Sequence, residues 1–216
     1  MVLIAGVDES GRGPVIGPLV MAGVMMNEIY LSKLDKLGVK DSKLLTSKKR
    51  EELFPKIQEI CKYKILIIEP QEIDEAIFSE ELNLNWLEAI KSTEIIRALK
   101  PDRVILDCPS PNIPKYTNYV REKLNMKEVE VICEHKADVN HKIVGAASIL
   151  AKVTRDKIIA KLERKYGNIG PGYTSNKITQ KFLKENWEKH PEIFRKSWVS
   201  WQNHSRNKAQ KKLGEF

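Results

Sequence analysis

The amino-acid sequence predicts an α/β protein with a mixed β-sheet. Two apolar runs, residues 2–7 and 15–26, lie close together at the start of the chain and indicate neighbouring strands. From residue 46 onward, segments with helical and strand-like patterns alternate. We therefore expect a sheet that is antiparallel at its start and helix-connected afterwards.

The first half of the chain contains a tight turn, a helix and a further strand. Residues 10–14 join the two opening strands, and the two glycines of this Ser-Gly-Arg-Gly-Pro stretch permit backbone angles that are closed to other residues. Residues 46–61 carry apolar side chains at helical spacing, with Pro55 as a point where the helix can bend. Residues 64–69 are expected to form the third strand.

The second half repeats the alternation of helix and strand. Residues 83–100 show a mostly apolar helical stripe that stops just before Pro101, and residues 103–106 are expected to form the next strand. A shorter helix is expected at 115–124 and a strand at 128–133, where apolar residues alternate.

Residues 139–165 show the strongest helical pattern of the sequence. The first half of this segment is rich in small residues, namely Gly145, Ala146, Ala147, Ser148 and Ala151. We expect so slim a helix to lie close against a sheet or to bring its backbone near a ligand.

A change of composition near residue 165 indicates a boundary. Glycines and a proline are frequent at 167–172, and the remainder is polar, lysine-rich and helical in pattern. Its tryptophans, including Trp187, Trp198 and Trp201, are expected to complete a small helical core rather than to stack on bases. The tail at 207–212 is expected to be disordered.

The composition favours an intracellular protein with a polyanionic partner. The 216 residues include 37 Lys and Arg against 29 acidic residues, a formal charge of +8, which favours nucleic acids, although many other soluble proteins carry a basic excess. The three cysteines lack a CxxC pattern and indicate neither a disulfide framework nor a cysteine zinc site, so we expect a cytoplasmic location. No apolar run approaches the roughly 18 residues of a membrane span.

Four carboxylates fall at element boundaries. Asp8 and Glu9 end the first strand, Asp107 ends the strand at 103–106, and Asp138 stands before the long helix. If the strands are neighbours, these acids converge at one edge of the sheet, where metal ions or protonation would relieve their repulsion. From position alone, Asp138 can equally cap its helix and Asp107 can begin a turn.

Carboxylate oxygens are ligands that magnesium and manganese prefer. Two such ions about 3.5–4 Å apart can support in-line attack of water on a phosphodiester. The four histidines form no HxxxH or HExxH arrangement, so a zinc hydrolase is not indicated.

Several blocks of sequence, in a fixed order, carry a resemblance to a known family. Residues 6–20, Gly-Val-Asp-Glu-Ser-Gly-Arg-Gly-Pro-Val-Ile-Gly-Pro-Leu-Val, closely resemble the opening signature of ribonuclease HII. Further matching blocks lie at 41–45, 106–107, 135–138, 146–156 and 170–173. The resemblance spans residues 6–173 and is strongest to the archaeal branch.

The resemblance implies an RNase H-like mixed sheet with a C-terminal helical appendage. It implies that residues 1–165 form the catalytic domain and 166–216 a helical substrate-binding region. It also implies an endonuclease that hydrolyses the RNA strand of RNA-DNA hybrids and cuts 5′ of ribonucleotides in duplex DNA, leaving 3′-hydroxyl and 5′-phosphate ends. The implied metal-binding catalytic acids are Asp8, Glu9, Asp107 and Asp138, with Mg²⁺ or Mn²⁺ as cofactor and two ions at the site.

The turn at Gly11, Arg12 and Gly13 is a candidate ribose-binding element. Two positions without side chains let the backbone approach a sugar while the arginine meets a phosphate, although a plain glycine turn would look the same. In the resembled family this motif recognises the 2′-hydroxyl. Tyr173 matches the family tyrosine at the RNA-DNA junction, the alternative being a loop anchor.

Phosphate contacts are expected from Ser42 and Lys43, although a loop lysine is commonly just solvated. Lys152, Arg155 and Lys177 are weaker phosphate candidates on helix surfaces. Asp107 is followed by Cys-Pro-Ser-Pro instead of the glycine-containing continuation of bacterial relatives, which leaves open which backbone groups line the site.

Two other functions compete with this interpretation. A junction resolvase could use similar carboxylates on an all-DNA substrate, but the Gly-Arg-Gly turn argues against it. A non-catalytic nucleic-acid-binding protein would bind hybrids without cutting them. The expected partners are RNA-DNA hybrid and ribonucleotide-containing duplex DNA, the expected state is a monomer, and a sliding-clamp partner is left open by the sequence.

Overall fold

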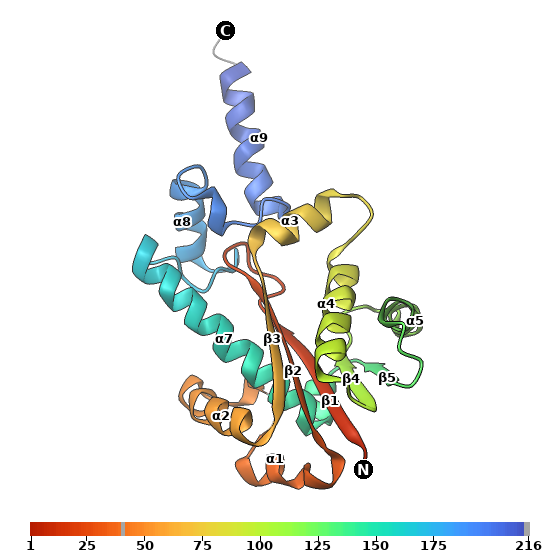
Figure 1. The fold of residues 1–216 in the computed structure, drawn as a ribbon. Coiled ribbons are helices and arrows are strands. Elements are labelled where there is room, and N and C mark those ends of the chain that lie inside the picture. Colours follow the sequence, from red (N-terminus) through yellow and green to blue (C-terminus); the bar gives the residue numbers. More distant parts are fainter. Residues whose placement is uncertain (40–41, 214–216) are drawn as a thin grey trace.

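The fold is built on a mixed sheet, as predicted. The computed structural model describes residues 1–39 and 42–213, so Asp41 of the 41–45 block lies outside the described residues. In the described part of the chain the sheet has five strands in the order β3-β2-β1-β4-β5 (Figure 1). The strands are β1 (Leu3–Ser10), β2 (Leu19–Asn27), β3 (Lys62–Ile68), β4 (Arg103–Asp107) and β5 (Glu130–Glu134). β1 pairs antiparallel with β2 and β2 with β3, whereas β1 pairs parallel with β4 and β4 with β5.

Helices cover both faces of the sheet (Figure 1). One face packs against α3 (Pro70–Phe78), α4 (Leu84–Leu99) and α5 (Ile113–Leu124). The other face packs against α1 (Ser32–Leu37), α2 (Ser47–Ile60) and α7 (Lys142–Tyr166). The remaining helical segments are α6 (Ala137–Asn140), α8 (Lys177–Asn186), α9 (Val199–Leu213) and the short 3-10 turns η1 (Glu28–Tyr30), η2 (Ser42–Leu44) and η3 (Pro191–Ile193).

Several helices begin at side chains that cap them. The side-chain oxygens of Thr46, Asn83 and Asn112 accept hydrogen bonds from backbone N–H groups three residues further on. Each cap satisfies a donor that the first turn of a helix leaves without a partner. The starts predicted at residues 46 and 83 are thereby confirmed, and Pro55 lies inside α2 without ending it.

β1 and α7 approach each other closely because both lack bulk at their contact. A Cβ placed on Gly6 would lie 2.5 Å from the carbonyl carbon of Ile143 and from the nitrogen of Val144. On the helix side, Ala146 and Ala147 are fully buried. The expectation that the slim half of this helix lies against the sheet is confirmed, and this contact places α7 beside the end of β1.

The second apolar run was predicted to be strand from residue 15, which is wrong for its first four residues. β2 begins at Leu19, because the preceding residues pair with the C-terminal region. Val15 donates its N–H to the Gly172 carbonyl at 2.8 Å, and Gly17 donates to the Ile193 carbonyl at 2.9 Å. Val15 and Ile16 lie in a core cluster with the aromatic residues of the C-terminal region. Trp187, Trp198 and Trp201 pack against this cluster, which confirms their expected role.

The helix predicted over 139–165 is interrupted. His141 has extended backbone angles that separate α6 from α7, so Asp138 lies inside α6 and does not directly precede the long helix. α9 runs to Leu213, and the disorder expected at 207–212 stays a prediction. The segment contains Lys, Ala and Gln, which favour helix. The short helices α1 and α3 were not predicted, since few residues in each define a period.

No helix in the described ranges is long and apolar enough to cross a membrane.

Substituting Gly6 by alanine tests the contact between β1 and α7. We expect Gly6→Ala to lower the free energy of unfolding by about 3 kcal/mol, because the added methyl meets backbone atoms that cannot move aside without strain. Gly38→Ala is the comparison. Gly38 has a left-handed φ of +79°, and an added methyl group there would meet open space. This substitution should lower the free energy of unfolding by only about 1 kcal/mol. Equal losses in urea unfolding would contradict this account.

Candidate metal-dependent active site

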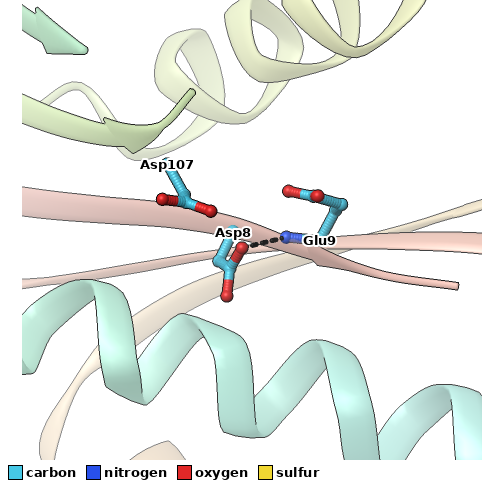
Figure 2. Close-up of side chains that lie close together, drawn as sticks. All are labelled: Asp8, Glu9 and Asp107. Atoms are coloured by element: carbon cyan, nitrogen blue, oxygen red, sulfur yellow. Dashed lines mark hydrogen bonds between the residues drawn. The ribbon is translucent and has the colours of Figure 1, made fainter. Parts of the chain in front are cut away.

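The ends of two parallel strands bring carboxylates together. Val7 of β1 is aligned with Leu106 of β4, so Asp8 and Asp107 follow at the same edge of the sheet. Ligand oxygens of Asp8, Glu9 and Asp107 all lie within 4.8 Å of one another. Figure 2 shows Asp8 and Glu9 projecting to opposite sides of β1, with Asp107 beside Asp8. The expected convergence of these three acids is therefore present in the structure.

Backbone N–H groups orient two of these carboxylates. Asp8 Oδ1 accepts a hydrogen bond from the Glu9 N–H at 2.8 Å (Figure 2). Asp107 Oδ1 accepts one from the Ala137 N–H at 2.8 Å, and this peptide lies at the start of α6. The backbone group that lies against Asp107 thus comes from the 135–138 block and not from the Cys-Pro-Ser-Pro continuation.

The three carboxyls are poorly compensated. Burial, reinforced by Glu9 and Asp107, raises the pKa of Asp8 well above its ordinary value. Burial, together with Glu88 and Asp107, raises the pKa of Glu9 to about 8, and burial also raises the pKa of Asp107. Like charges held together away from water disfavour ionisation. A cation would reverse this effect, and a set of hard carboxylate oxygens fits Mg²⁺ or Mn²⁺.

Asp138 lies outside this group of three. It is 3% exposed in α6, and its Oδ2 accepts a hydrogen bond from Lys43 Nζ at 3.2 Å. Its charge contributes to the raised pKa of Asp107, so it is close enough to be felt electrostatically. The structure therefore pairs Asp138 with Lys43 on the Asp107 side of the acids.

The three acids open into a pocket of about 300 Å³. Its other lining residues are polar or small, namely Ser10, Gly11, Arg12, Gly13, Ser42, Lys43, Arg50, Ser148, Lys152 and Tyr173. One pocket thus holds three of the four proposed catalytic acids together with the main substrate-binding candidates, namely Gly11, Arg12, Gly13, Ser42, Lys43 and Tyr173. Of the weaker phosphate candidates, Lys152 also lines it, whereas Arg155 and Lys177 do not.

The Gly-Arg-Gly turn requires its first glycine. Gly11 has φ +87°, and a Cβ there would meet the Arg155 side chain at 2.1 Å. The Arg12 guanidinium is held by Glu88 of α4, with Nε 2.9 Å from Oε1, and by the side-chain oxygen of Asn85. Burial raises the pKa of Glu88 to about 7, against the opposing effect of Arg12.

Tyr173 stands across the pocket from the turn. A Cβ placed on Gly13 would lie 3.5 Å from Tyr173 Cε1, so a side chain there would narrow the space between them. Tyr173 is 41% exposed, which leaves its ring accessible from the pocket. The guanidinium carbon of Arg155 lies 5.8 Å from the centre of the Tyr173 ring.

The phosphate candidates occupy different environments. Ser42 is buried with its hydroxyl 2.8 Å from that of Ser148 on α7. Lys152 lines the pocket and pairs with Asp156 at 2.6 Å. Arg155 was expected on a helix surface, which is wrong, because it is 2% exposed and donates to the Ile16 carbonyl. Lys177 is exposed at the start of α8 and does not line this pocket.

The sequence did not identify three residues around the pocket, namely Glu88, Arg50 and Arg195. The Arg195 guanidinium donates hydrogen bonds to the carbonyls of Gly11 and Arg12. Glu88 is 1% exposed in the apolar stripe of α4, and a charged residue in such a stripe was the available signal. Arg50 lines the pocket and donates to the Ser42 and Leu45 carbonyls. No sequence pattern distinguishes Arg50 or Arg195 from other basic residues of helices and loops.

Solved structures define the class of the fold. A ribonuclease H2 from Pyrococcus horikoshii OT3 aligns with a TM-score of 0.87 and 40% identity, covering 95% of this chain and 98% of that chain. An RNase HII from Archaeoglobus fulgidus, solved in complex with PCNA, aligns with a TM-score of 0.81 and 38% identity, covering 93% of this chain and 94% of that chain. The protein is an RNase H enzyme with an RNase H-like fold.

Sequence comparison narrows the class to one family. The profile described as Ribonuclease HII matches residues 5–201. A relative named Ribonuclease HII from Methanococcus maripaludis strain C5 is 47% identical over 208 residues, covering 93% of this chain and 86% of the relative. The chain belongs to the ribonuclease HII family, and the expected similarity to archaeal members is confirmed.

The burial of the acids, reinforced by their mutual repulsion, is expected to make the stability of the fold depend on pH. The folded chain holds the Glu9 proton up to about pH 8, whereas an ordinary glutamate has a pKa of 4.5. The folded state binds more protons between these values, so the free energy of unfolding falls as pH rises through this window when no metal is bound. We expect Glu9→Gln in EDTA to stabilise the protein by about 1–3 kcal/mol at pH 8 and by little at pH 4.5.

Thermal unfolding at the two pH values measures this effect. Glu122→Gln is the control, because that side chain is 73% exposed on α5. Addition of Mg²⁺ or Mn²⁺ at pH 8 should stabilise the wild type more than Glu9→Gln. An unchanged melting temperature for Glu9→Gln at pH 8 would refute the account.

Proposed function

We propose that this protein cuts the RNA strand of RNA-DNA hybrids and also cuts duplex DNA on the 5′ side of an embedded ribonucleotide, leaving 3′-hydroxyl and 5′-phosphate ends. One observation carries the proposal. The acidic cluster opens into the same pocket as the Gly11–Gly13 turn and Tyr173. The candidate metal site therefore adjoins a turn whose two glycines would let the backbone approach a sugar, and family membership supports activity on hybrids.

In this proposal, Asp8, Glu9 and Asp107 bind divalent metal, and Asp138 completes a site for two Mg²⁺ or Mn²⁺ ions. The bound ions would supply activation of the attacking water and neutralisation of charge on the leaving 3′ oxygen. The Ala137 N–H keeps one oxygen of Asp107 in a fixed direction. The ammonium group of Lys43 pairs with Asp138 and offsets its negative charge when no second cation or phosphate is bound.

Substrate recognition is assigned to the pocket walls. The backbone at Gly11, Arg12 and Gly13 contacts the ribose 2′-hydroxyl, which distinguishes RNA from DNA. Tyr173 stacks on the neighbouring deoxyribose. Ser42 and Lys43 contact the phosphate near the cut. Arg12 is held by Glu88, so its position at the pocket does not depend on substrate.

The remaining assignments concern regions and partners. We propose residues 1–165 as the catalytic domain and 166–216 as a substrate-binding region that acts in a monomer. The Archaeoglobus fulgidus relative was solved with PCNA, and we propose a clamp of that type as a partner. Three buried, unpaired cysteines support a cytoplasmic, reducing location.

Asparagine substitutions test the acids. We expect Asp8→Asn and Asp107→Asn each to lower kcat at least about 10³-fold on a labelled duplex with one ribonucleotide, because each removes a charge that binds metal. Fragments should map to the 5′ side of the ribonucleotide for the wild type, with no cutting of the all-DNA duplex. Glu122→Gln should cut normally. Normal cutting by both asparagine variants would overturn the site assignment, and cutting of an all-DNA junction would favour a resolvase.

Lys43→Gln tests the phosphate contact. We expect KM to rise about 3- to 10-fold and the dependence of binding on salt to weaken by about one charge, because one phosphate contact is lost. Lys62→Gln is the matched control, since Lys62 pairs with Met25 at the end of the sheet remote from the acids. Binding titrations at several salt concentrations measure both quantities, and equal effects of the two substitutions would argue against a specific contact.

A further inference from the structure

One short segment near the end of the chain binds the carbonyls of the whole Gly-Arg-Gly turn. Arg195 donates from Nη2 to the Gly11 carbonyl at 2.5 Å and from Nη1 to the Arg12 carbonyl at 2.8 Å. Trp198 donates from Nε1 to the Gly13 carbonyl at 3.1 Å. Three successive peptide groups are therefore fixed by two side chains that lie more than 180 positions later in the sequence.

Arg195 is fully buried, which is unusual for a charged side chain. Its exposure is 0%, and burial lowers its pKa to about 9. A third donor, Nε, binds the Gly17 carbonyl at 3.0 Å, so each nitrogen of the guanidinium contacts backbone of the segment 11–17. A buried charge is tolerated when its hydrogen-bonding groups are satisfied, and here they are satisfied by the loop that lines the pocket.

The segment that carries Arg195 is itself fixed by α3. Asp74 is 7% exposed and accepts hydrogen bonds from the Lys196 N–H at 2.8 Å, the Ser197 N–H at 2.8 Å and the Ser197 hydroxyl at 2.6 Å. Its charge, with that of Glu88, also favours the charged form of Arg195. The turn is thus connected to α3 through Arg195 and the two residues that follow it.

The hydrogen bonds to the carbonyls of the turn also determine the direction of its N–H groups. A trans peptide is planar, so its N–H points away from its carbonyl. With the Gly11 and Arg12 carbonyls directed at Arg195, the N–H groups of Arg12 and Gly13 are directed away from it. These residues line the pocket, so their donors are set in direction before a substrate binds.

We propose that Arg195 and Trp198 are positioning residues for ribose recognition, which hold the Gly11–Gly13 turn in the shape that distinguishes a ribonucleotide from a deoxyribonucleotide. This inference rests on the proposed function of the turn. Neither side chain needs to touch the nucleic acid. Their effect is on discrimination between sugars and not on general affinity for the duplex backbone.

Trp198→Phe is the mildest test, because it removes the indole N–H and keeps an aromatic ring against the core. The measurement is binding of a duplex with one ribonucleotide and of the all-DNA duplex of the same sequence, by fluorescence anisotropy in EDTA. We expect the ratio of the two affinities to fall about 3- to 10-fold, the effect of one lost hydrogen bond. Affinity for all-DNA duplex should stay unchanged.

Trp201→Phe is the matched control. It makes the same chemical change in α9, but the buried Trp201 Nε1 has no hydrogen-bond partner within the part of the chain that the structure describes. This variant should keep the wild-type ratio. Arg195→Lys keeps the buried charge but loses the forked contact with two carbonyls, and should lower the ratio about 30-fold or more.

The outcomes separate the inference from the function on which it rests. Equal binding of both duplexes by the wild type would overturn the proposed function and the inference with it. A wild-type preference for the ribonucleotide that Trp198→Phe retains would overturn the inference alone. A loss of affinity for both duplexes in equal proportion would also overturn it, because it would show a general structural role.

Discussion

Mutual repulsion among buried carboxylates is the constraint on which the rest of the site depends. Asp8, Glu9 and Asp107 are brought within 4.8 Å of one another by the pairing of two central strands. The surrounding structure sustains this arrangement through the packing of α7 on β1, which needs Gly6, and through the peptide of Ala137. The cluster thereby lowers the stability of the fold, and a bound divalent cation would offset this cost.

A second constraint joins the two ends of the chain. The residues between the turn and β2 hydrogen-bond with the C-terminal region and share its hydrophobic cluster. The composition of the sequence changes near residue 165, but residues from both sides of this position pack together in one hydrophobic cluster. The pocket beside the acids accordingly has walls from both regions, since Tyr173 follows the boundary and lies near Gly13.

The sequence predicted the sheet, its mixed direction and the acids at its edge, because strand periodicity and position in the chain are local properties. It could not show that His141 would break the helix after Asp138, since that depends on a single extended residue. It also could not show that Ser42 would face Ser148, or that Glu88 would hold Arg12, because these contacts join segments far apart in the chain.

The long-range link from Arg195 to the turn also bears on how the protein is made. Synthesis on the ribosome proceeds from the N-terminus, so β1, which carries Asp8, emerges before the other strands of the sheet. Arg195 donates hydrogen bonds to the carbonyls of Gly11 and Arg12, but it is synthesised about 180 residues after them. A nascent chain therefore contains Asp8, Glu9, Asp107 and Asp138 well before Arg195 is available to fix the turn. Under the proposed function, discrimination between sugars would follow only after the acids are in place.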